Sequence, residues 1–344
     1  MRKHFNLALV GATGLVGQSV FAILQERKFP VDTLYLLASE RSAGETMMFN
    51  KHALCVTQLA DFDFKHVDIA FFTAGSAISA QYVPEAIKNG CLVIDNTAHY
   101  RYDKDVPLVI PEVNPEALAG YKKRLIIANP NCATIQMLVA LKPIYDAVGI
   151  ARINVVTFQS VSGAGKRAFQ ELIQQTTQLL NGLPIKKPHA LTQQIAFNVI
   201  PQIDVFEGNG YTREEMKMVW ETQKILSDKE IQINSTAVRV PVFYGHSEAV
   251  HIETKQKISI ARAKQLLKKA AGVCVLDKSA NNGYPTPFSL PESDDVMVGR
   301  LREDISHPLG LDMWIVADNI RKGAALNAIQ IAELMIKNYL HAEK

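Results

Sequence analysis

The residues that decide the fold are Leu7-Ala8-Leu9-Val10-Gly11-Ala12-Thr13-Gly14-Leu15-Val16-Gly17. The four apolar residues at 7–10 predict a short buried strand, and the apolar spacing over 15–25 predicts a helix. A glycine-rich turn between strand and helix lets a pyrophosphate approach the backbone at the helix N-terminus. The spacing is GxxGxxG, a variant of GxGxxG, and a tight turn without a ligand is the alternative. The residues expected to contact a dinucleotide are Gly11, Thr13, Gly14, Leu15, Val16 and Gly17.

Strand and helix patterns alternate through the first part of the chain. The expected strands are 7–10, 34–37, 67–72, 91–94 and 125–128, and the expected helices are 15–25 and 79–88. This alternation is typical of an α/β protein with a parallel, doubly wound sheet and right-handed crossovers. We therefore predict a Rossmann-like dinucleotide-binding domain.

The pattern changes after residue 130. The expected helices are 135–148, 167–180, 212–226 and 322–339, the expected strands are 152–159, 238–242, 249–254 and 313–317, and prolines interrupt 183–201. This mixture predicts a second domain of the α+β class. The last helix is expected to return to the first domain, so the predicted domains are 1–130 plus 320–344, and 131–319.

Size and composition narrow the functional classes. A chain of 344 residues is long enough for two domains. The formal net charge is +3 with scattered Lys and Arg, so nucleic acid and membranes are poor candidates for partners. The four cysteines lie far apart, without the spacing of a zinc site or a disulfide framework. No apolar run reaches the length of a signal sequence core or a membrane span, which predicts a soluble cytoplasmic protein.

The residues after the second strand bear on cofactor choice. An NAD-type site places an acidic residue there, against the ribose 2′-hydroxyl. This chain reads Ala38-Ser39-Glu40-Arg41-Ser42, and Ser39, Arg41 and Ser42 are suited to a 2′-phosphate. Glu40 keeps the NAD alternative open, as does a solvated loop without a ligand. NADP is the preferred interpretation.

Cys132 is the candidate nucleophile. It lies in Asn129-Pro130-Asn131-Cys132-Ala133-Thr134, between an apolar strand pattern and a long helical pattern. A thiol at the positive end of a helix is favoured as the thiolate, and the free N–H groups there can hold a developing oxyanion. The alternative is a small buried hydrophobic residue, because free cysteine is often buried.

Two further turns carry candidate groups. Gln159 ends the strand expected at 152–159, and Ser162 and Gly163 follow in a turn that permits close approach of a ligand. His246 lies in the turn Gly245-His246-Ser247, where it could serve Cys132 as acid and base. A plain connection at the first turn and a structural histidine at the second are the alternatives.

Charged residues complete the candidate set. Arg101 follows the strand expected at 91–94, where loops at strand C-termini form a ligand crevice. Glu214 and Lys217 lie at i, i+3 near the start of an expected helix. A solvated helix face is the alternative for that pair.

Together these segments resemble the aspartate-semialdehyde dehydrogenase family. The motifs that carry the resemblance, in family order and spacing, are GATGLVG, ASERSAG, DNTAHYR, VIPEVN, NPNCAT, QSVSGAG, FNVIPQID, EEMKM, RVPVFYGHS and VADNIRKGAA. They extend over nearly the whole chain. The resemblance implies reduction of L-aspartyl 4-phosphate by NADPH to L-aspartate 4-semialdehyde and phosphate, in lysine, methionine and threonine biosynthesis.

The resemblance also implies roles for individual residues. Cys132 would be the nucleophile, His246 the acid and base, and Gln159 would orient the reacting group. The implied ligands are Arg239 for the substrate carboxylate, Glu214 for its amine, Arg101 with Lys217 for the phosphate, and Asn319 for the nicotinamide end of NADP. No metal is implied. The second domain would form the interface of a homodimer, in some members a dimer of dimers.

Ala133 departs from the family pattern, which more often has Ser or Thr after the nucleophile. Backbone donors remain there, so activity is expected to persist. One alternative is a reductase of N-acetyl-glutamyl phosphate, but Glu214 would have no ammonium to bind in that substrate. A non-catalytic paralogue with a binding or assembly role is the other, and it would be expected to lack Cys132 or His246.

Overall fold

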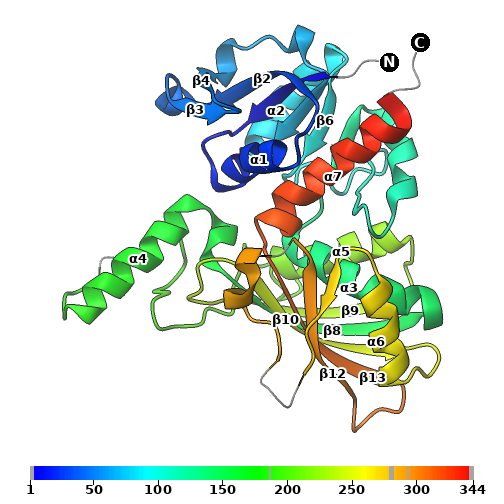
Figure 1. The fold of residues 1–344 in the computed structure, drawn as a ribbon. Coiled ribbons are helices and arrows are strands. Elements are labelled where there is room, and N and C mark those ends of the chain that lie inside the picture. The colour runs from blue at the N-terminus through cyan, green and yellow to red at the C-terminus, as the bar shows by residue number, and fades with distance from the viewer. Residues whose placement is uncertain (1–3, 186, 279–282, 293, 341–344) are drawn as a thin grey trace. The chain divides into compact units, whose positions relative to one another are not determined.

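The computed structural model describes residues 4–185, 187–278, 283–292 and 294–340. The chain forms two compact units, each with its own β-sheet (Figure 1). Unit 1 comprises Met1–Pro130 and Ala324–Lys344. Unit 2 comprises Asn131–Gly323.

Unit 1 is built on a seven-stranded sheet in the order β3-β4-β2-β1-β5-β6-β7. Neighbouring strands pair in parallel, except that β3 and β4 form an antiparallel hairpin at the edge. The strands are β1 (Phe5–Val10), β2 (Val31–Ala38), β3 (Thr46–Phe49), β4 (His52–Gln58), β5 (Ile69–Phe72), β6 (Leu92–Asp95) and β7 (Ile126–Ala128). The predicted Rossmann-like sheet is confirmed.

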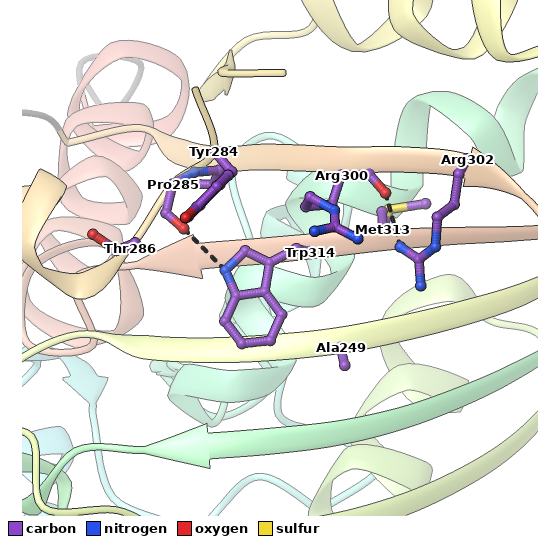
Figure 2. A pocket seen from close by; sticks show the side chains of 8 residues that line it. All are labelled: Ala249, Tyr284, Pro285, Thr286, Arg300, Arg302, Met313 and Trp314. Atoms are coloured by element: carbon purple, nitrogen blue, oxygen red, sulfur yellow. Dashed lines mark hydrogen bonds between the residues drawn. The ribbon is translucent and has the colours of Figure 1, made fainter. Parts of the chain in front are cut away.

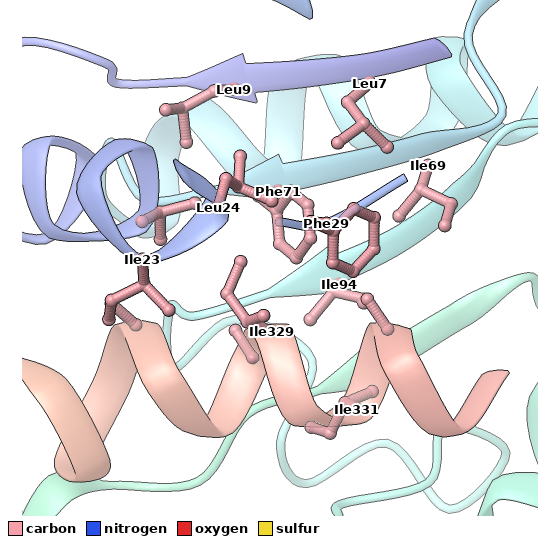
Figure 3. Close-up of a cluster of buried hydrophobic side chains, with 14 of the residues drawn as sticks. Leu7, Leu9, Ile23, Leu24, Phe29, Ile69, Phe71, Ile94, Ile329 and Ile331 are labelled. Atoms are coloured by element: carbon pink, nitrogen blue, oxygen red, sulfur yellow. The ribbon is translucent and has the colours of Figure 1, made fainter. Parts of the chain in front are cut away.

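Helices of unit 1 pack on this sheet. They are α1 (Leu15–Glu26), α2 (Ser76–Lys88) and α7 (Leu326–Met335), with short helical turns η1 (Glu40–Ser42), η2 (Leu59–Asp61), η3 (Phe64–His66), η4 (Pro115–Lys123) and η9 (Ile336–Leu340). A further helical turn, η8 (Arg321–Ala325), leads into α7. Leu9, Phe71 and Ile94 from three strands form one buried cluster with Ile329 of α7 (Figure 3). The central strands are buried on both faces, so their sequences are continuous apolar runs, and these runs were sufficient to predict them.

Unit 2 contains a six-stranded mixed sheet in the order β11-β12-β13-β10-β8-β9. The pairs β8–β9 and β11–β12 are parallel, and the others are antiparallel. The strands are β8 (Ile150–Gln159), β9 (Gln232–Arg239), β10 (His246–Thr254), β11 (Val273–Val275), β12 (Val296–Glu303) and β13 (Gly310–Ala317). This mixed sheet with its helices confirms the α+β character predicted for the second domain.

The long helix of unit 2 packs across the sheet. It is α3 (Cys132–Val148), which contacts β8, β10, β12 and β13 and lies between α5 (Arg213–Leu226) and α6 (Ile260–Lys269). The remaining helical segments are α4 (Lys166–Leu180), η5 (Val161–Ala164) and η7 (Pro287–Glu292). Along β8, inward residues such as Thr157 and Gln159 are buried, whereas Val156 on the opposite face is 37% exposed. One face of the sheet is therefore covered by helices and the other is open.

Several elements differ from the sequence-based expectation. The strand expected at 238–242 is wrong, since β9 ends at Arg239 and Pro241 lacks the N–H that a strand needs. The hairpin β3–β4, the strands β11 and β12 and the helix α6 were not predicted at all. The hairpin strands are half exposed, so they lack a continuous apolar run. Among the described residues, no helix has the length and apolar character needed to cross a membrane.

Candidate active site

Cys132 is the first residue of α3, and Asn131 caps this helix. The Oδ1 atom of Asn131 accepts hydrogen bonds from the N–H groups of Ala133 at 3.0 Å and Thr134 at 3.3 Å. The thiol of Cys132 is thus held at the positive end of a 17-residue helix. The partial positive charge of such a helix end favours the thiolate.

A close backbone approach fixes the surroundings of this cysteine. A Cβ atom placed on Gly323 would lie 2.8 Å from the Cβ of Cys132. Any residue larger than glycine at 323 would therefore displace the nucleophile or the segment that precedes α7. Cys132 is partly exposed, which is compatible with access by a substrate.

Asn131 also connects the nucleophile to buried carboxylates of α5. Its backbone N–H donates to Oε2 of Glu221 at 2.6 Å, and its Nδ2 donates to Oε1 of Glu214 at 2.8 Å. Both glutamates are buried. The residue next to Cys132 is therefore held by its backbone and by both ends of its side chain.

Glu214 accepts hydrogen bonds from three side chains. Besides Asn131, these are Gln159 at 3.1 Å, and Lys217 at 3.0 Å to the second carboxylate oxygen. Burial alone would raise the pKa of Glu214, but the Lys217 ammonium and these donors hold it at about 2. The pKa of Lys217 is raised, because Glu214 and Asp204 outweigh the effect of its burial. Glu214 and Lys217 are thus an ionised pair at neutral pH.

The local sequence explains why Glu214 points toward the sheet. Thr212 and Glu215 form a capping box at the start of α5. Glu215 also accepts a hydrogen bond from the backbone N–H of Ala237 in β9 at 2.9 Å, and its carbonyl accepts one from Ser235. The first turn of α5 is thereby tied to β9, and Glu214 within that turn is placed next to Gln159 at the end of β8.

His246 is completely buried at the start of β10. The backbone N–H of Ser160 donates to its Nδ1 at 3.1 Å, which assigns the ring proton to Nε2. Nε2 has no hydrogen-bond partner among the described residues. Burial, reinforced by the positive charge of Arg239, lowers the pKa of His246 to about 3. The ring is therefore neutral, with a buried donor available to a bound ligand.

Arg239 lies beside this histidine. Its guanidinium donates to the carbonyl of Ser160 at 2.8 Å, and burial lowers its pKa although the charges of Glu214 and Cys132 oppose that effect. A Cβ atom on Gly163 would lie 3.1 Å from this guanidinium and 3.2 Å from Nε2 of His246. Gly163 therefore leaves room at the point where Arg239 and His246 converge.

Asn319 holds the turn that precedes His246. Its Oδ1 accepts from the N–H of Gly245 at 2.9 Å and from the hydroxyl of Ser160 at 3.1 Å, while its amide pairs with Ser162 at 3.0 Å. The structure thus gives Asn319 and Ser162 a structural task beside the one predicted for them at the cofactor.

The predicted residues of unit 2 fall into one cluster. Hydrogen bonds, ion pairs and close approaches connect Cys132, Gln159, Ser162, Gly163, Glu214, Lys217, Arg239, His246 and Asn319. The members of the network that were missed include Asn131, Ser160, Glu221 and Gly323. The preference of Asn for helix N-caps could have identified Asn131. The sequence contains no comparable signal for Glu221 or Gly323.

The remaining predicted residues lie in unit 1. Arg101 is buried and donates to the backbone carbonyls of Asn129 at 2.9 Å and Asn96 at 3.0 Å. It therefore holds together the loops that follow β6 and β7. In the described part of the chain, no three His, Cys, Asp or Glu residues are grouped as a metal site would require.

The glycine-rich turn has the features of a phosphate cradle. A Cβ atom added to Gly11 would lie 2.7 Å from the hydroxyl oxygen of Thr73, and one added to Gly17 would lie 2.1 Å from the backbone oxygen of Gly11. Both positions are therefore too crowded for a larger residue. The N-cap residue of α1 is the exposed Gly14, which has no side chain to accept a hydrogen bond from the first N–H groups of the helix. The first turn of α1 therefore fits a diphosphate.

The loop after β2 lies beside this cradle. The hydroxyl of Thr13 donates to that of Ser42 at 3.2 Å. Ser39 and Arg41 are exposed in the same loop, and so is Glu40. A serine and an arginine next to the cradle fit a 2′-phosphate.

Two family matches cover most of the chain. Residues 6–121 match the family described as semialdehyde dehydrogenase, NAD binding domain, and residues 141–322 match semialdehyde dehydrogenase, dimerisation domain. An aspartate-semialdehyde dehydrogenase of Legionella pneumophila is 58% identical over 341 residues, which cover 99% of this chain and 98% of that protein. The resemblance inferred from the motifs is confirmed.

Solved structures agree with these matches. The crystal structure of aspartate semialdehyde dehydrogenase II from Vibrio cholerae complexed with ASA has a TM-score of 0.96 and 56% identity. It covers 98% of this chain and 100% of its own. An aspartate semialdehyde dehydrogenase from Candida albicans, crystallised with NADP, has a TM-score of 0.76 at 26% identity, covering 97% of this chain and 98% of its own.

Proposed function

Because this chain belongs to the aspartate-semialdehyde dehydrogenase family, we propose that it reduces L-aspartyl 4-phosphate to L-aspartate 4-semialdehyde and phosphate through a thioester on Cys132. One observation carries the proposal. Cys132 begins α3 directly after Asn131, whose side chain is hydrogen-bonded to the ionised Glu214. A thiolate beside a fixed anion and a buried Arg239 matches a substrate that bears a reactive acyl group, an ammonium and a carboxylate.

The charges of the cluster match those of aspartyl phosphate. Arg239 binds the α-carboxylate with its planar fork, and Glu214 accepts the α-ammonium. A carboxylate has about four acceptor sites, so three existing donors leave Glu214 room for one more. Lys217, with Arg101, binds the phosphate. An ionised Glu214 also disfavours an N-acetylated substrate, because acetylation removes the ammonium that would offset its charge.

Catalysis begins with the thiolate of Cys132. It attacks the acyl carbon, a carbon–sulfur bond forms, and the bond from that carbon to the phosphate oxygen breaks. Gln159 orients the acyl group. The Nε2–H of His246 donates a hydrogen bond to the acyl oxygen, which becomes negative when that carbon is tetrahedral. This donor needs no reorganisation, because Ser160 already fixes the ring.

When bound at the sites named below, NADPH would supply the hydride that reduces the thioester to a thiohemiacetal. His246 donates to its oxygen, and cleavage of the carbon–sulfur bond returns the thiolate of Cys132 and releases the aldehyde. The diphosphate would be held by Gly11, Thr13, Gly14, Leu15, Val16 and Gly17, the 2′-phosphate by Ser39, Arg41 and Ser42, and the nicotinamide end by Ser162, Gly163 and Asn319.

The open face of the unit 2 sheet fits a homodimer interface. It displays Val156 and Ala249, and the indole of Trp314 borders a pocket on this unit and donates to the carbonyl of Pro285 at 3.0 Å (Figure 2). A half-apolar sheet face without covering helices is suited to a second copy of the chain. Introduction of a negative charge by V156E is expected to yield monomers in analytical ultracentrifugation. The exposed control M48E, on β3 of unit 1, should leave the dimer intact.

Two finer assignments accompany the dimer. Some members of the family associate further into a dimer of dimers, and the same sedimentation run would resolve that form. We assign the enzyme to the cytoplasm, where its four free cysteines would stay reduced.

The activity is tested in the reverse direction. Purified protein should reduce NADP through repeated turnovers in the presence of aspartate semialdehyde only when phosphate is added. C132A should abolish this turnover. Phosphate-dependent turnover retained by C132A would contradict the proposed function.

A further inference from the structure

A second buried carboxyl group lies close to His246 but takes no part in the reaction described above. Glu248 follows His246 by two residues on β10, so both side chains project from the covered face of the sheet. Glu248 is completely buried, and among the described residues no donor has good hydrogen-bond geometry to either of its oxygens, although the Gln136 amide lies close enough to offset part of the effect of burial on its pKa. A buried polar group without a partner is costly, so a carboxyl here needs an explanation.

The neighbour of this carboxyl group is Gln136 of α3. Gln136 follows Cys132 by four residues, so the two share one face of the helix. Its Nε2 donates to the backbone carbonyl of His246 at 3.3 Å, whereas its Oε1 is buried with no hydrogen-bond partner in the described part of the chain. Gln136 therefore links the helix of the nucleophile to the strand that carries His246, but one of its two polar ends has no partner among the described residues.

A proton on Glu248 would give a hydrogen-bond partner both to the Glu248 carboxyl group and to Oε1 of Gln136. An ionised carboxylate can only accept, and the unsatisfied Oε1 of Gln136 can only accept as well. A neutral carboxylic acid has an O–H that can donate to that oxygen. The environment favours this form, because burial raises the pKa of Glu248 well above its ordinary value and Gln136 offsets that effect only in part.

We propose that Glu248 is a positioning residue that acts as a neutral acid. Its O–H donates to Oε1 of Gln136, and Gln136 in turn fixes the start of β10, so the pair sets His246 relative to Cys132. The proposal rests on the function proposed above for these two residues. A misplacement of a reacting group by about 1 Å can cost roughly 100-fold in rate.

The protonation state is tested first, by a measurement that needs no activity. Infrared difference spectra between the wild type and E248Q at neutral pH should contain the C=O stretch of a protonated carboxyl group. A carboxylate band lost in E248Q instead would overturn the proposal. Because the spectrum does not depend on turnover, this outcome is separate from any failure of the proposed reaction.

Kinetics test the positioning role. E248Q keeps a neutral donor, so its kcat and the pH dependence of kcat should equal those of the wild type. E248L lacks any donor, and its kcat should fall roughly 10- to 100-fold with little change in KM. Equal losses in E248Q and E248L would contradict the proposed hydrogen bond, as would full activity of both.

A matched control separates positioning from general damage. Val250 is the next inward residue of β10 and is also buried. V250A leaves a cavity in the same face and should lower the melting temperature without lowering kcat. If V250A reduced kcat as much as E248L does, the effect of E248L would be ordinary loss of packing, and the positioning role would be wrong.

Discussion

The backbone N–H of Ser160 donates a hydrogen bond to Nδ1 of His246 over 3.1 Å. This contact decides what the histidine can do, since it directs the ring proton to Nε2. The Nε2–H has no partner among the residues that the structure describes, so it can donate to an oxygen that becomes negative during the reaction. The lowered pKa of His246 indicates that this donor is a neutral imidazole.

Replacement of His246 should lower kcat far more than replacement of Ser160. H246A removes the Nε2 donor and is expected to lower kcat by roughly 10²- to 10³-fold. S160A keeps the main-chain N–H that bonds to Nδ1, so its loss should be much smaller. Steady-state kinetics of both variants are the measurement. Equal losses would show that the serine hydroxyl, rather than the backbone, orients the ring.

The stability of the protein should depend on His246 in acid. Its pKa is about 3 in the folded chain and 6.5 in the unfolded chain, so the unfolded state binds a proton first as the pH falls. The contribution of the neutral ring is complete above pH 6.5 and is lost progressively between 6.5 and 3. The free energy of unfolding by urea should therefore fall more steeply in the wild type than in H246Q over this window.

Between pH 6.5 and 4.5, the contribution of His246 to the free energy of unfolding can be measured separately from that of Glu214. The pKa of Glu214 is about 2 in the folded chain against an ordinary value of 4.5, so its contribution is complete above 4.5 and is lost between 4.5 and 2. Parallel curves for the wild type and H246Q between pH 6.5 and 4.5 would contradict the assignment of a neutral, buried His246.

Asn131 should contribute to both stability and substrate binding. N131A removes the cap of α3, which is expected to cost about 1 kcal/mol in the free energy of unfolding. It also removes a donor to Glu214, so KM for aspartate semialdehyde should rise. N131S retains a capping oxygen but has no amide to donate to Glu214. N131S should therefore restore most of the stability measured by urea denaturation without restoring KM.

The loop after β2 should set the choice of cofactor. Arg41 is exposed beside Ser42, which is bonded to the glycine-rich turn through Thr13. R41A should raise KM for NADP and leave KM for NAD unchanged, because NAD has no 2′-phosphate. The neighbouring variant E40A is the control and should not weaken NADP. A wild-type enzyme that turns over faster with NAD would overturn the assignment.

Much of unit 1 could be predicted from the sequence, because its central strands are buried on both faces and read as apolar runs. Unit 2 was harder, since its sheet is half exposed and β12 carries arginines among its apolar residues. Helix α6 was missed because much of its sequence is basic, although Ser259 caps it and accepts from the N–H of Arg262. The N-cap preference of serine would have been the available signal.

The candidate residues of unit 2 lie in one cluster, but the contacts between them could not be predicted from the sequence. Asn131 and Glu214 are 83 positions apart, and Gln136 and His246 are 110 positions apart. Both contacts form because the side chains are buried together, and their burial depends on tertiary packing, such as that of α3 on β10. Glu248 is only two residues after His246 in the sequence, yet its neutral form follows only from the buried face on which it lies.

The central claim is that Cys132 carries an aspartyl thioester, and a single-turnover experiment tests it directly. Enzyme mixed with aspartate semialdehyde and NADP in the absence of phosphate should release one burst of NADPH per active site and then stop. Acid quenching and peptide mass analysis should then locate one aspartyl group on the peptide that contains Cys132. A burst without an adduct on that peptide, or an adduct that persists in C132S, would contradict the account.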